Sequence, residues 1–179
     1  MKRTVSSNDA VYLNGKIYVP GGMLSSGLVI TNHQVYDLAT NAWKEVLEPP
    51  TSVIYSTLVA DTAQNRYYRI GGRNANNSSA ISPELFVYDV KANEWTELSP
   101  LPEARYGHEA VFINGRIFVA GGADRSTGLR TCWQYDPATD FWTPFASLNK
   151  KRRFAASALG SDAQGNPLWF LLGGDDPDT

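Results

Sequence analysis

The stretch Ala110-Val-Phe-Ile-Asn-Gly-Arg-Ile-Phe-Val-Ala-Gly-Gly122 decides the fold of this chain. It consists of two apolar runs around Asn114-Gly115, and it ends on a glycine doublet. An Asn-Gly pair between such runs is the strongest short signal of a β-hairpin, because a type I′ turn needs positive φ at both central residues. We therefore predict two antiparallel strands here, followed by a backbone conformation that favours glycine.

The same signals return at a nearly constant interval along the sequence. Glycine doublets begin at Gly21, Gly71, Gly121 and Gly173, which are 50, 50 and 52 residues apart. A Tyr-Asp pair follows each of the first three doublets at a variable distance, and Trp stands seven residues after Tyr in the pairs Tyr36 and Trp43, Tyr88 and Trp95, and Tyr135 and Trp142. Each unit of about 50 residues is thus predicted to hold four short strands in up-and-down order, as in a propeller blade.

The ordered set of Gly-Gly, Tyr-Asp and Trp resembles the Kelch repeat family over essentially the whole chain. The resemblance implies an all-β fold, a Kelch-type β-propeller with about three and a half four-stranded antiparallel blades. One partial propeller domain would cover residues 1–179, with blades at about 1–50, 51–102 and 103–148 and a half blade at 149–179. Trp43, Trp95 and Trp142 are expected to be buried in equivalent places between blades.

Three and a half blades leave the predicted propeller incomplete, because propellers typically close with about 4–8 blades. Three interpretations stay open: a segment of a longer protein that supplies the missing blades, a homodimer that closes a ring, or an open, capped arc. In each, the apolar run Leu168-Trp-Phe-Leu-Leu172 forms a strand edge near the end of the repeats. We expect this edge to promote self-association of the isolated chain.

The composition excludes several classes of protein. A formal net charge of −2 gives no reason to expect nucleic-acid or membrane-surface binding. No apolar run approaches the roughly 20 residues that span a bilayer. The first residues lack an apolar segment of signal-peptide length, so the cytoplasm is the default compartment, with an extracellular location open for an N-terminally truncated chain. Cys132, the single cysteine, is expected to be a buried filler at the start of a strand.

No catalytic motif is visible in the sequence, and we predict no enzyme, no metal and no cofactor. The two histidines, His33 and His108, do not stand in a metal-ligand spacing. We place His33 in a loop after the first doublet and His108 near the start of a strand, where it forms hydrogen bonds. The alternative is a fragment of a Kelch-propeller enzyme that acts on sugars, similar to a sialic-acid mutarotase, in which polar side chains converge on the channel.

Two sets of loops are expected to converge on one propeller face and to recognise a protein or peptide partner. The first set follows the doublets, at residues 23–33, 73–82 and 123–130, and the second joins successive blades, at residues 49–55, 100–108 and 147–154. This predicts a Kelch-repeat binding scaffold, used for protein or ligand recognition.

The resemblance also suggests which residues bind. In animal Kelch adaptors, arginines of the joining loops line the central pocket and bind acidic peptide motifs, which implies this role for Arg105 and Arg153. Val53 occupies the matching place in the second blade, so the set of arginines is incomplete. The alternative for both arginines is hydrogen bonding to loop carbonyls. The full set of candidate binding residues is Arg105, Arg153, Tyr106, His108, Arg73, Asn74 and Arg125.

Overall fold

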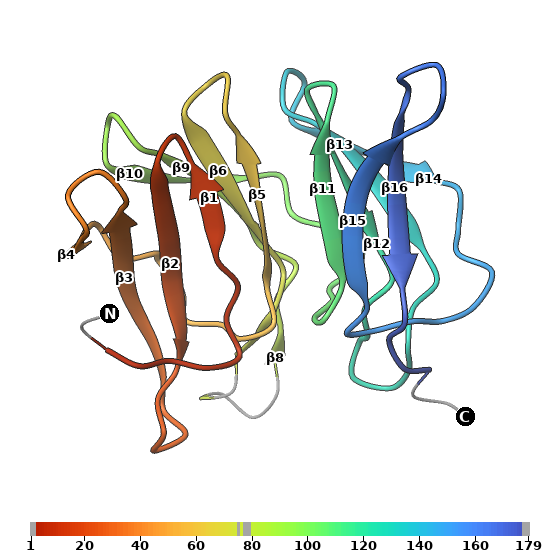
Figure 1. The fold of residues 1–179 in the computed structure, drawn as a ribbon. Helices are drawn as coiled ribbons and strands as arrows, with labels where there is room; N and C mark the ends of the chain where they lie inside the picture. The colour runs from red at the N-terminus through yellow and green to blue at the C-terminus, as the bar shows by residue number, and fades with distance from the viewer. Residues whose placement is uncertain (1–2, 75, 77–79, 177–179) are drawn as a thin grey trace. The chain divides into compact units, whose positions relative to one another are not determined.

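In the computed structural model, every element of regular secondary structure among the described residues is a β-strand (Figure 1). The structure describes residues 3–74, 76 and 80–176. These residues fall into two compact units, Met1–Tyr106 and Gly107–Thr179, and each unit is described by itself. In the described part of the chain, no helix has the length and apolar character to cross a membrane.

The first unit contains two four-stranded antiparallel sheets and a short hairpin. The first sheet has its strands in chain order: β1 (Val11–Leu13), β2 (Lys16–Met23), β3 (Val29–Asp37) and β4 (Ala42–Glu45). The second has the order β5 (Thr57–Asp61), β6 (Arg66–Ile70), β9 (Leu85–Asp89) and β10 (Glu94–Leu98). Between β6 and β9, the chain forms the hairpin of β7 (Arg73–Asn74) and β8 (Ala80–Ile81).

The second unit contains one four-stranded and one two-stranded antiparallel sheet. The four strands are β11 (Glu109–Ile113), β12 (Arg116–Ala120), β13 (Cys132–Asp136) and β14 (Phe141–Phe145), and the two are β15 (Ala156–Ser161) and β16 (Pro167–Leu172). Cys132 is buried at the start of β13, as predicted. The all-β fold with four-stranded antiparallel sheets is therefore confirmed.

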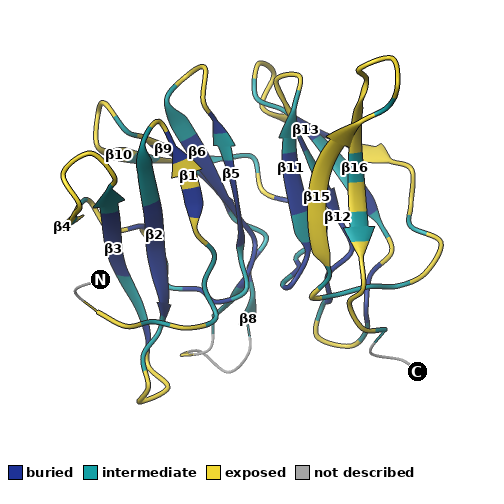
Figure 2. Cartoon of the chain, in the orientation of Figure 1, coloured by how far each residue is buried: buried dark blue, intermediate teal, exposed yellow. Residues whose placement is uncertain are grey.

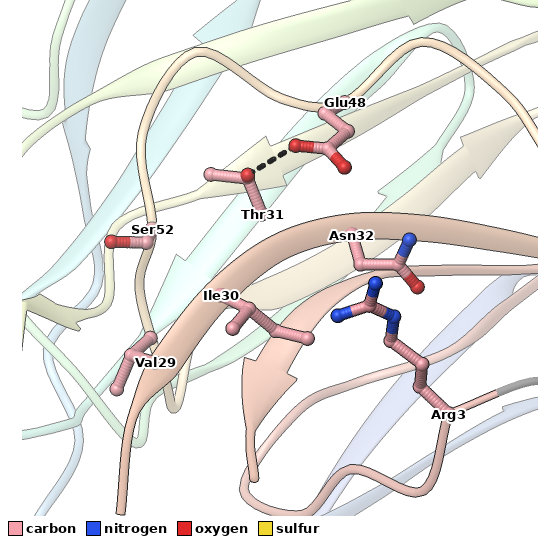
Figure 3. A pocket seen from close by; sticks show the side chains of 7 residues that line it. All are labelled: Arg3, Val29, Ile30, Thr31, Asn32, Glu48 and Ser52. Atoms are coloured by element: carbon pink, nitrogen blue, oxygen red, sulfur yellow. Dashed lines mark hydrogen bonds between the residues drawn. The ribbon is translucent and has the colours of Figure 1, made fainter.

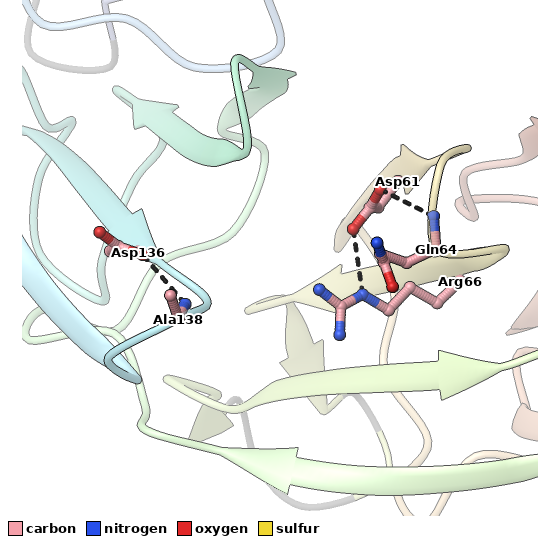
Figure 4. Close-up of polar contacts among 5 residues, drawn as sticks. All are labelled: Asp61, Gln64, Arg66, Asp136 and Ala138. Atoms are coloured by element: carbon pink, nitrogen blue, oxygen red, sulfur yellow. Dashed lines mark hydrogen bonds and ion pairs between the residues drawn. The ribbon is translucent and has the colours of Figure 1, made fainter.

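The hairpin turns follow the predicted backbone chemistry. Asn114 and Gly115 have φ of 50° and 78°, which is the pair of positive values that a type I′ turn requires. Asp136 stabilises the next turn of its sheet, because its carboxylate accepts a hydrogen bond of 2.9 Å from the backbone N–H of Ala138 (Figure 4). In the first unit, Asp61 has the same role and also pairs with Arg66 at 3.1 Å (Figure 4).

The Tyr-Asp…Trp signature is a cross-strand arrangement with one further member. Tyr88 lies opposite Trp95 in the register of β9 and β10, with 5.0 Å between the ring centroids. The Tyr88 hydroxyl donates to Oδ1 of Asn93, which has φ of 57° and ends the turn. Asn41 and Asp140 stand at the same place after Tyr36 and Tyr135 and accept the same bond. The motif is thus Tyr-Asp, then Asn or Asp five residues after Tyr, then Trp.

The glycine doublets are required because neighbouring backbone crosses them at close range. Gly71 and Gly72 have φ of 58° and 113°. A Cβ at Gly72 would lie 3.0 Å from the carbonyl oxygen of Ile54, and the Gly72 N–H donates to the carbonyl of Arg105 at 2.9 Å. Any other residue at Gly72 would therefore be both strained and crowded.

Two expectations about burial and loops were wrong. Trp142 is 6% exposed, but Trp43 and Trp95 are only half-buried, because burial depends on what packs over each outer strand and not on its place in the repeat. The first loop after a doublet covers only residues 24–28, since β2 and β3 stay paired beyond the doublet through a register shift between Pro20 and Gly22. His33 therefore lies inside β3 and is fully buried.

Candidate functional site

Loops from both predicted sets are held together at one edge of the first unit. Asn76 binds the backbone of Val29 twice: its side-chain amide donates to the Val29 carbonyl at 2.7 Å and its Oδ1 accepts from the Val29 N–H at 3.1 Å. Ile54 of the joining segment forms a two-bond bridge with Arg73, at 2.9 and 2.8 Å. We call this the loop edge, made of residues 24–28, 49–55 and 100–106 and the described residues of 73–81.

Arg73 and Tyr106 meet on the loop edge. The Arg73 guanidinium carbon lies 5.9 Å from the centre of the Tyr106 ring, and the Tyr55 ring centre is 6.2 Å from that of Tyr106. All three side chains are half-buried. The attraction between a guanidinium and an aromatic face holds the Arg73 charge at a defined place on the loop edge.

Arg105 lies beside this pair in the sequence but is occupied within the protein. Its side chain is fully buried and forms an ion pair with Glu103, with 2.8 Å between Nη2 and Oε2. Its Nε donates to the Glu103 carbonyl at 3.2 Å. Arg105 therefore has the environment of a residue that orders the joining segment, in addition to accepting the bond from Gly72 through its carbonyl.

The predicted alignment of Arg105 with Arg153 in their joining segments is off by one residue in the structure. Tyr55, Gly107 and Phe154 have positive φ of 57°, 59° and 50°, and they mark the same place in three joining segments. The residue two before this place is Val53, Arg105 and Arg152, respectively. The Arg152 carbonyl accepts from the Gly122 N–H at 2.7 Å, as the Arg105 carbonyl does from Gly72. Arg105 thus corresponds to Arg152, and pairing it with Arg153 was wrong.

Arg153 corresponds to Tyr106 and forms a separate contact in the second unit. Its guanidinium lies 2.9 Å from Oδ2 of Asp175 and 5.5 Å from the centre of the Phe154 ring. The hydrogen bond from Arg153 lowers the pKa of the Asp175 carboxyl. An arginine over an aromatic ring therefore occurs in both units, at Arg73 and at Arg153.

The remaining predicted residues are distributed over both units. Asn74 ends β7, and its Oδ1 accepts from the Asn76 N–H at 3.1 Å. His108 is 3% exposed and directly precedes β11. Arg125 is exposed, in a turn where the Asp124 carboxylate accepts from two backbone N–H groups. Within the first unit, the structure brings Arg73, Asn74, Arg105 and Tyr106 to the loop edge.

A buried ionic network under the loop edge was missed by sequence reasoning. Arg69 of β6 is 2% exposed and donates to the carbonyl and to Oγ1 of Thr51, both at 2.6 Å. The Thr51 hydroxyl in turn donates to Glu84 at 2.7 Å. Burial lowers the pKa of Arg69 to about 10, so it stays cationic at neutral pH. The signal was available, since Arg69 is charged where the other complete repeats have Val19 and Val119.

Two hollows open beside these loops in the first unit. The smaller, of about 190 Å³, is lined by Thr51, Val53, Asn74, Ala80, Ile81, Ser82, Pro83 and Glu84. The larger, of about 390 Å³, is lined by Arg3, Val29, Ile30, Thr31, Asn32, Glu48 and Ser52 (Figure 3). Both combine charged and polar groups with apolar side chains.

His33 has a structural environment. Its Nδ1 lies 2.7 Å from the Leu47 carbonyl, which can only accept, so Nδ1 carries the proton and Nε2 accepts from the Tyr67 hydroxyl at 2.8 Å. Burial lowers the pKa of His33 to about 4, which keeps the ring neutral. Trp95 donates to the same carbonyl at 3.0 Å. In the described residues, no group of three or more His, Cys, Asp or Glu side chains is placed to hold a metal ion.

Residues 7–179 match the KLHDC2/KLHL20/DRC7 Kelch-repeats domain. Kelch-like protein 23 from Homo sapiens is 30% identical over 134 residues, which cover 75% of this chain and 23% of that protein. Kelch-like protein 13 from Bos taurus is 38% identical over 79 residues, which cover 41% and 12%. Kelch repeat and BTB domain-containing protein 12 from Danio rerio is 30% identical over 147 residues, which cover 73% and 23%.

The chain therefore spans less than a quarter of the length of these relatives. The match to the Kelch-repeats domain agrees with the sheets, the doublets and the Tyr-Asp…Trp pairs, and this chain belongs to the Kelch-repeat family.

Proposed function

We propose that this Kelch-repeat domain is a binding scaffold that recognises a protein or peptide partner through the loop edge. The observation that carries the proposal is the coupling of two loops by Asn76 and Val29 together with the Ile54–Arg73 bridge. These bonds tie loops that are distant in the sequence to a rigid sheet, which is how scaffolds present recognition residues. Binding without catalysis is the activity that these features support.

Among the candidate residues, Arg73 and Tyr106 have the strongest support as direct contacts. Arg73 is half-buried and fixed over Tyr106. Arg105 and Arg153 already pair with Glu103 and Asp175, so an acidic partner would have to displace those carboxylates. We place an acidic group of the partner at Arg73, because its guanidinium lies over the Tyr106 ring and Asn74 is next to it in β7. His108 and Arg125 are retained as candidates of the second unit.

The test uses a natural matched control within the first unit. Arg66 lies over the Tyr68 ring at 5.5 Å, but it begins β6, whereas Arg73 follows the end of that strand. Peptides would be selected from a random displayed library on the parent chain, and each would be titrated against the Arg73→Ala and Arg66→Ala variants. We expect Arg73→Ala to weaken the selected peptides about tenfold, a loss typical of one charge-assisted bond.

The Arg66→Ala variant should bind the same peptides as the parent does. Equal affinities for the parent and the Arg73→Ala variant, or an equal loss in both variants, would overturn the proposal for the loop edge.

A further inference from the structure

The larger hollow contains a buried acceptor with no partner. Asn32 is 7% exposed, and its Oδ1 is buried without a hydrogen-bond partner among the described residues. Its Nδ2 donates to Oε1 of Glu45 at 3.2 Å. Because a carboxylate can only accept, the atom beside Glu45 must be the amide nitrogen, and this fixes the orientation of the amide oxygen. A buried oxygen of this kind favours any ligand that donates an N–H to it.

A cation is positioned at the same hollow by a second buried amide. The Gln34 side chain is fully buried and pairs with the backbone of Arg3, accepting from its N–H and donating to its carbonyl, both at 2.9 Å. This two-bond pairing fixes the backbone from which the Arg3 side chain extends. Figure 3 shows the Arg3 and Asn32 side chains on one side of the hollow. Among the described residues, the Arg3 guanidinium has no ion-pair partner.

The opposite side of the hollow carries a negative charge. Glu48 is exposed and accepts a hydrogen bond from the Thr31 hydroxyl through one carboxylate oxygen, Oε2 (Figure 3). A carboxylate has about four acceptor positions, so Glu48 can receive a further donor. The hollow therefore offers a cation on an anchored backbone, a buried neutral acceptor and an anion within about 390 Å³.

We propose that this hollow binds a peptide segment that carries charges of both signs. The partner's carboxylate pairs with Arg3, a backbone N–H donates to Oδ1 of Asn32, and a lysine ammonium approaches Glu48. The inference rests on the proposed function, since it names the chemistry of a peptide partner and adds a contact outside the candidate residues at Arg73 and Tyr106. A purely acidic segment is disfavoured here by Glu48 and a purely basic one by Arg3.

The test is an NMR titration of the 15N-labelled chain with acetylated, amidated Asp-Gly-Lys. Acetylation and amidation remove the terminal charges, so that the two side chains carry the charge. We expect saturable shifts of the Asn32 side-chain amide and the Arg3 Nε signals. The Arg3→Gln and Asn32→Leu variants should each raise the Kd about tenfold. The control peptide Asn-Gly-Lys has the same size as Asp-Gly-Lys but lacks its carboxylate. The parent protein should bind Asn-Gly-Lys as weakly as the Arg3→Gln variant binds Asp-Gly-Lys.

Lys91→Gln is the control, because Lys91 is an exposed cation outside the hollow. It should leave the Kd unchanged. Asn32→Leu removes the oxygen without a partner but also the bond from Nδ2 to Glu45, so its melting temperature is measured as a check of folding. If that variant does not fold, Arg3→Gln and the peptide pair still decide. Absent or non-saturable shifts, or equal binding of Asp-Gly-Lys and Asn-Gly-Lys, would overturn the inference. If Arg73→Ala still weakens selected peptides in that case, the proposed function stands and only the hollow is excluded.

Discussion

The aromatic cluster between the two sheets of the first unit and the β15–β16 hairpin of the second have the same repeat pattern but opposite exposure. Tyr18, Tyr67 and Tyr88 are 3%, 0% and 1% exposed, and their rings lie 5.3–6.1 Å apart. Phe170 and Leu172 of β16 are 46% and 60% exposed, and Figure 2 shows most of β15 and β16 at the surface. The apolar side chains of this repeat therefore become buried only where a neighbouring sheet packs over them, whatever the sequence of their own strand.

The largest expected effect is the loss of an aromatic ring from the cluster. Tyr67→Ala should lower the free energy of unfolding by about 3–5 kcal/mol, because it leaves a cavity among Tyr18, Tyr88 and Trp95 and removes the bond to His33. Urea denaturation followed by tryptophan fluorescence measures it. Phe170→Ala truncates an aromatic side chain on the exposed hairpin and should cost less than about 1 kcal/mol, because Phe170 is 46% exposed. Equal losses in the two variants would contradict the comparison.

A smaller effect is expected from the pH dependence of the same cluster. The folded protein holds the pKa of His33 at about 4, below its ordinary 6.5, because the ring is buried and Arg69 is near. Between pH 6.5 and about pH 4, His33 therefore binds a proton in the unfolded chain but not in the folded chain. The contribution of neutral His33 to the free energy of unfolding is fully present above pH 6.5. Below that pH it falls by about 1.4 kcal/mol for each pH unit, and the loss reaches roughly 3 kcal/mol at pH 4.

The free energy of unfolding of the parent and of His33→Gln is measured between pH 7 and pH 4. The difference between the two profiles separates the contribution of His33 from that of the carboxylates that titrate in the same range. One of these carboxylates, Glu48, raises the pKa of His33. The parent should lose more stability than the variant over this range. Parallel profiles would show that His33 is not held neutral.

The glycine doublet gives a third comparison, within one unit. Gly72→Ala should destabilise by roughly 2 kcal/mol, because φ of 113° is strained for alanine and the new Cβ would lie 3.0 Å from the Ile54 carbonyl oxygen. Gly15→Ala is also at positive φ but has no heavy atom within 4 Å of the new Cβ, so we expect a cost of about 1 kcal/mol. Thermal unfolding orders the two variants, and the reverse order would refute the crowding at Gly72.

The smallest effect on stability is expected on the exposed hairpin. Replacing Phe170 and Leu172 by lysine should change the free energy of unfolding by about 0.5 kcal/mol or less, since both side chains are largely exposed. The same change places charge on an apolar strand and should reduce self-association of the isolated chain. Light scattering at increasing protein concentration measures the molar mass of the parent and of the lysine variant. A parent chain that is monodisperse at 19.7 kDa would contradict the expected association.

The strands and turns could be predicted because their causes are local. Asn114-Gly115 specifies its turn through backbone sterics alone, and the spacing of Tyr88 and Trp95 follows from the register of one hairpin. The hydrogen bond from Tyr88 to Asn93 was also readable, because Asn or Asp recurs five residues after Tyr in all three motifs. The pattern is less conspicuous than the Tyr-Asp pair, because Asn and Asp share the position.

The placement of site residues could not be predicted because it depends on contacts between distant segments. His33 follows a doublet in the sequence, yet it lies inside β3 because the strand pairing resumes beyond a register shift. The correspondence of Arg105 and Arg152 is set by positive φ at Gly107 and Phe154, and phenylalanine gives no signal for that conformation. The larger hollow combines Arg3, Asn32 and Glu48, which no spacing in the sequence brings together.

The bonds that hold the loop edge divide each repeat into a fixed and a variable part. The joining segments dock on a glycine doublet through main-chain bonds, so their length is constrained, whereas the distance from doublet to tyrosine changes from one repeat to the next. Ser25 and Ser26 lie at the exposed tip of the β2–β3 hairpin, beyond the last paired residues, Met23 and Val29. A foreign peptide grafted at this tip would extend from the end of the β2–β3 hairpin without entering the sheet, so the domain can serve as a frame for engineering new specificities.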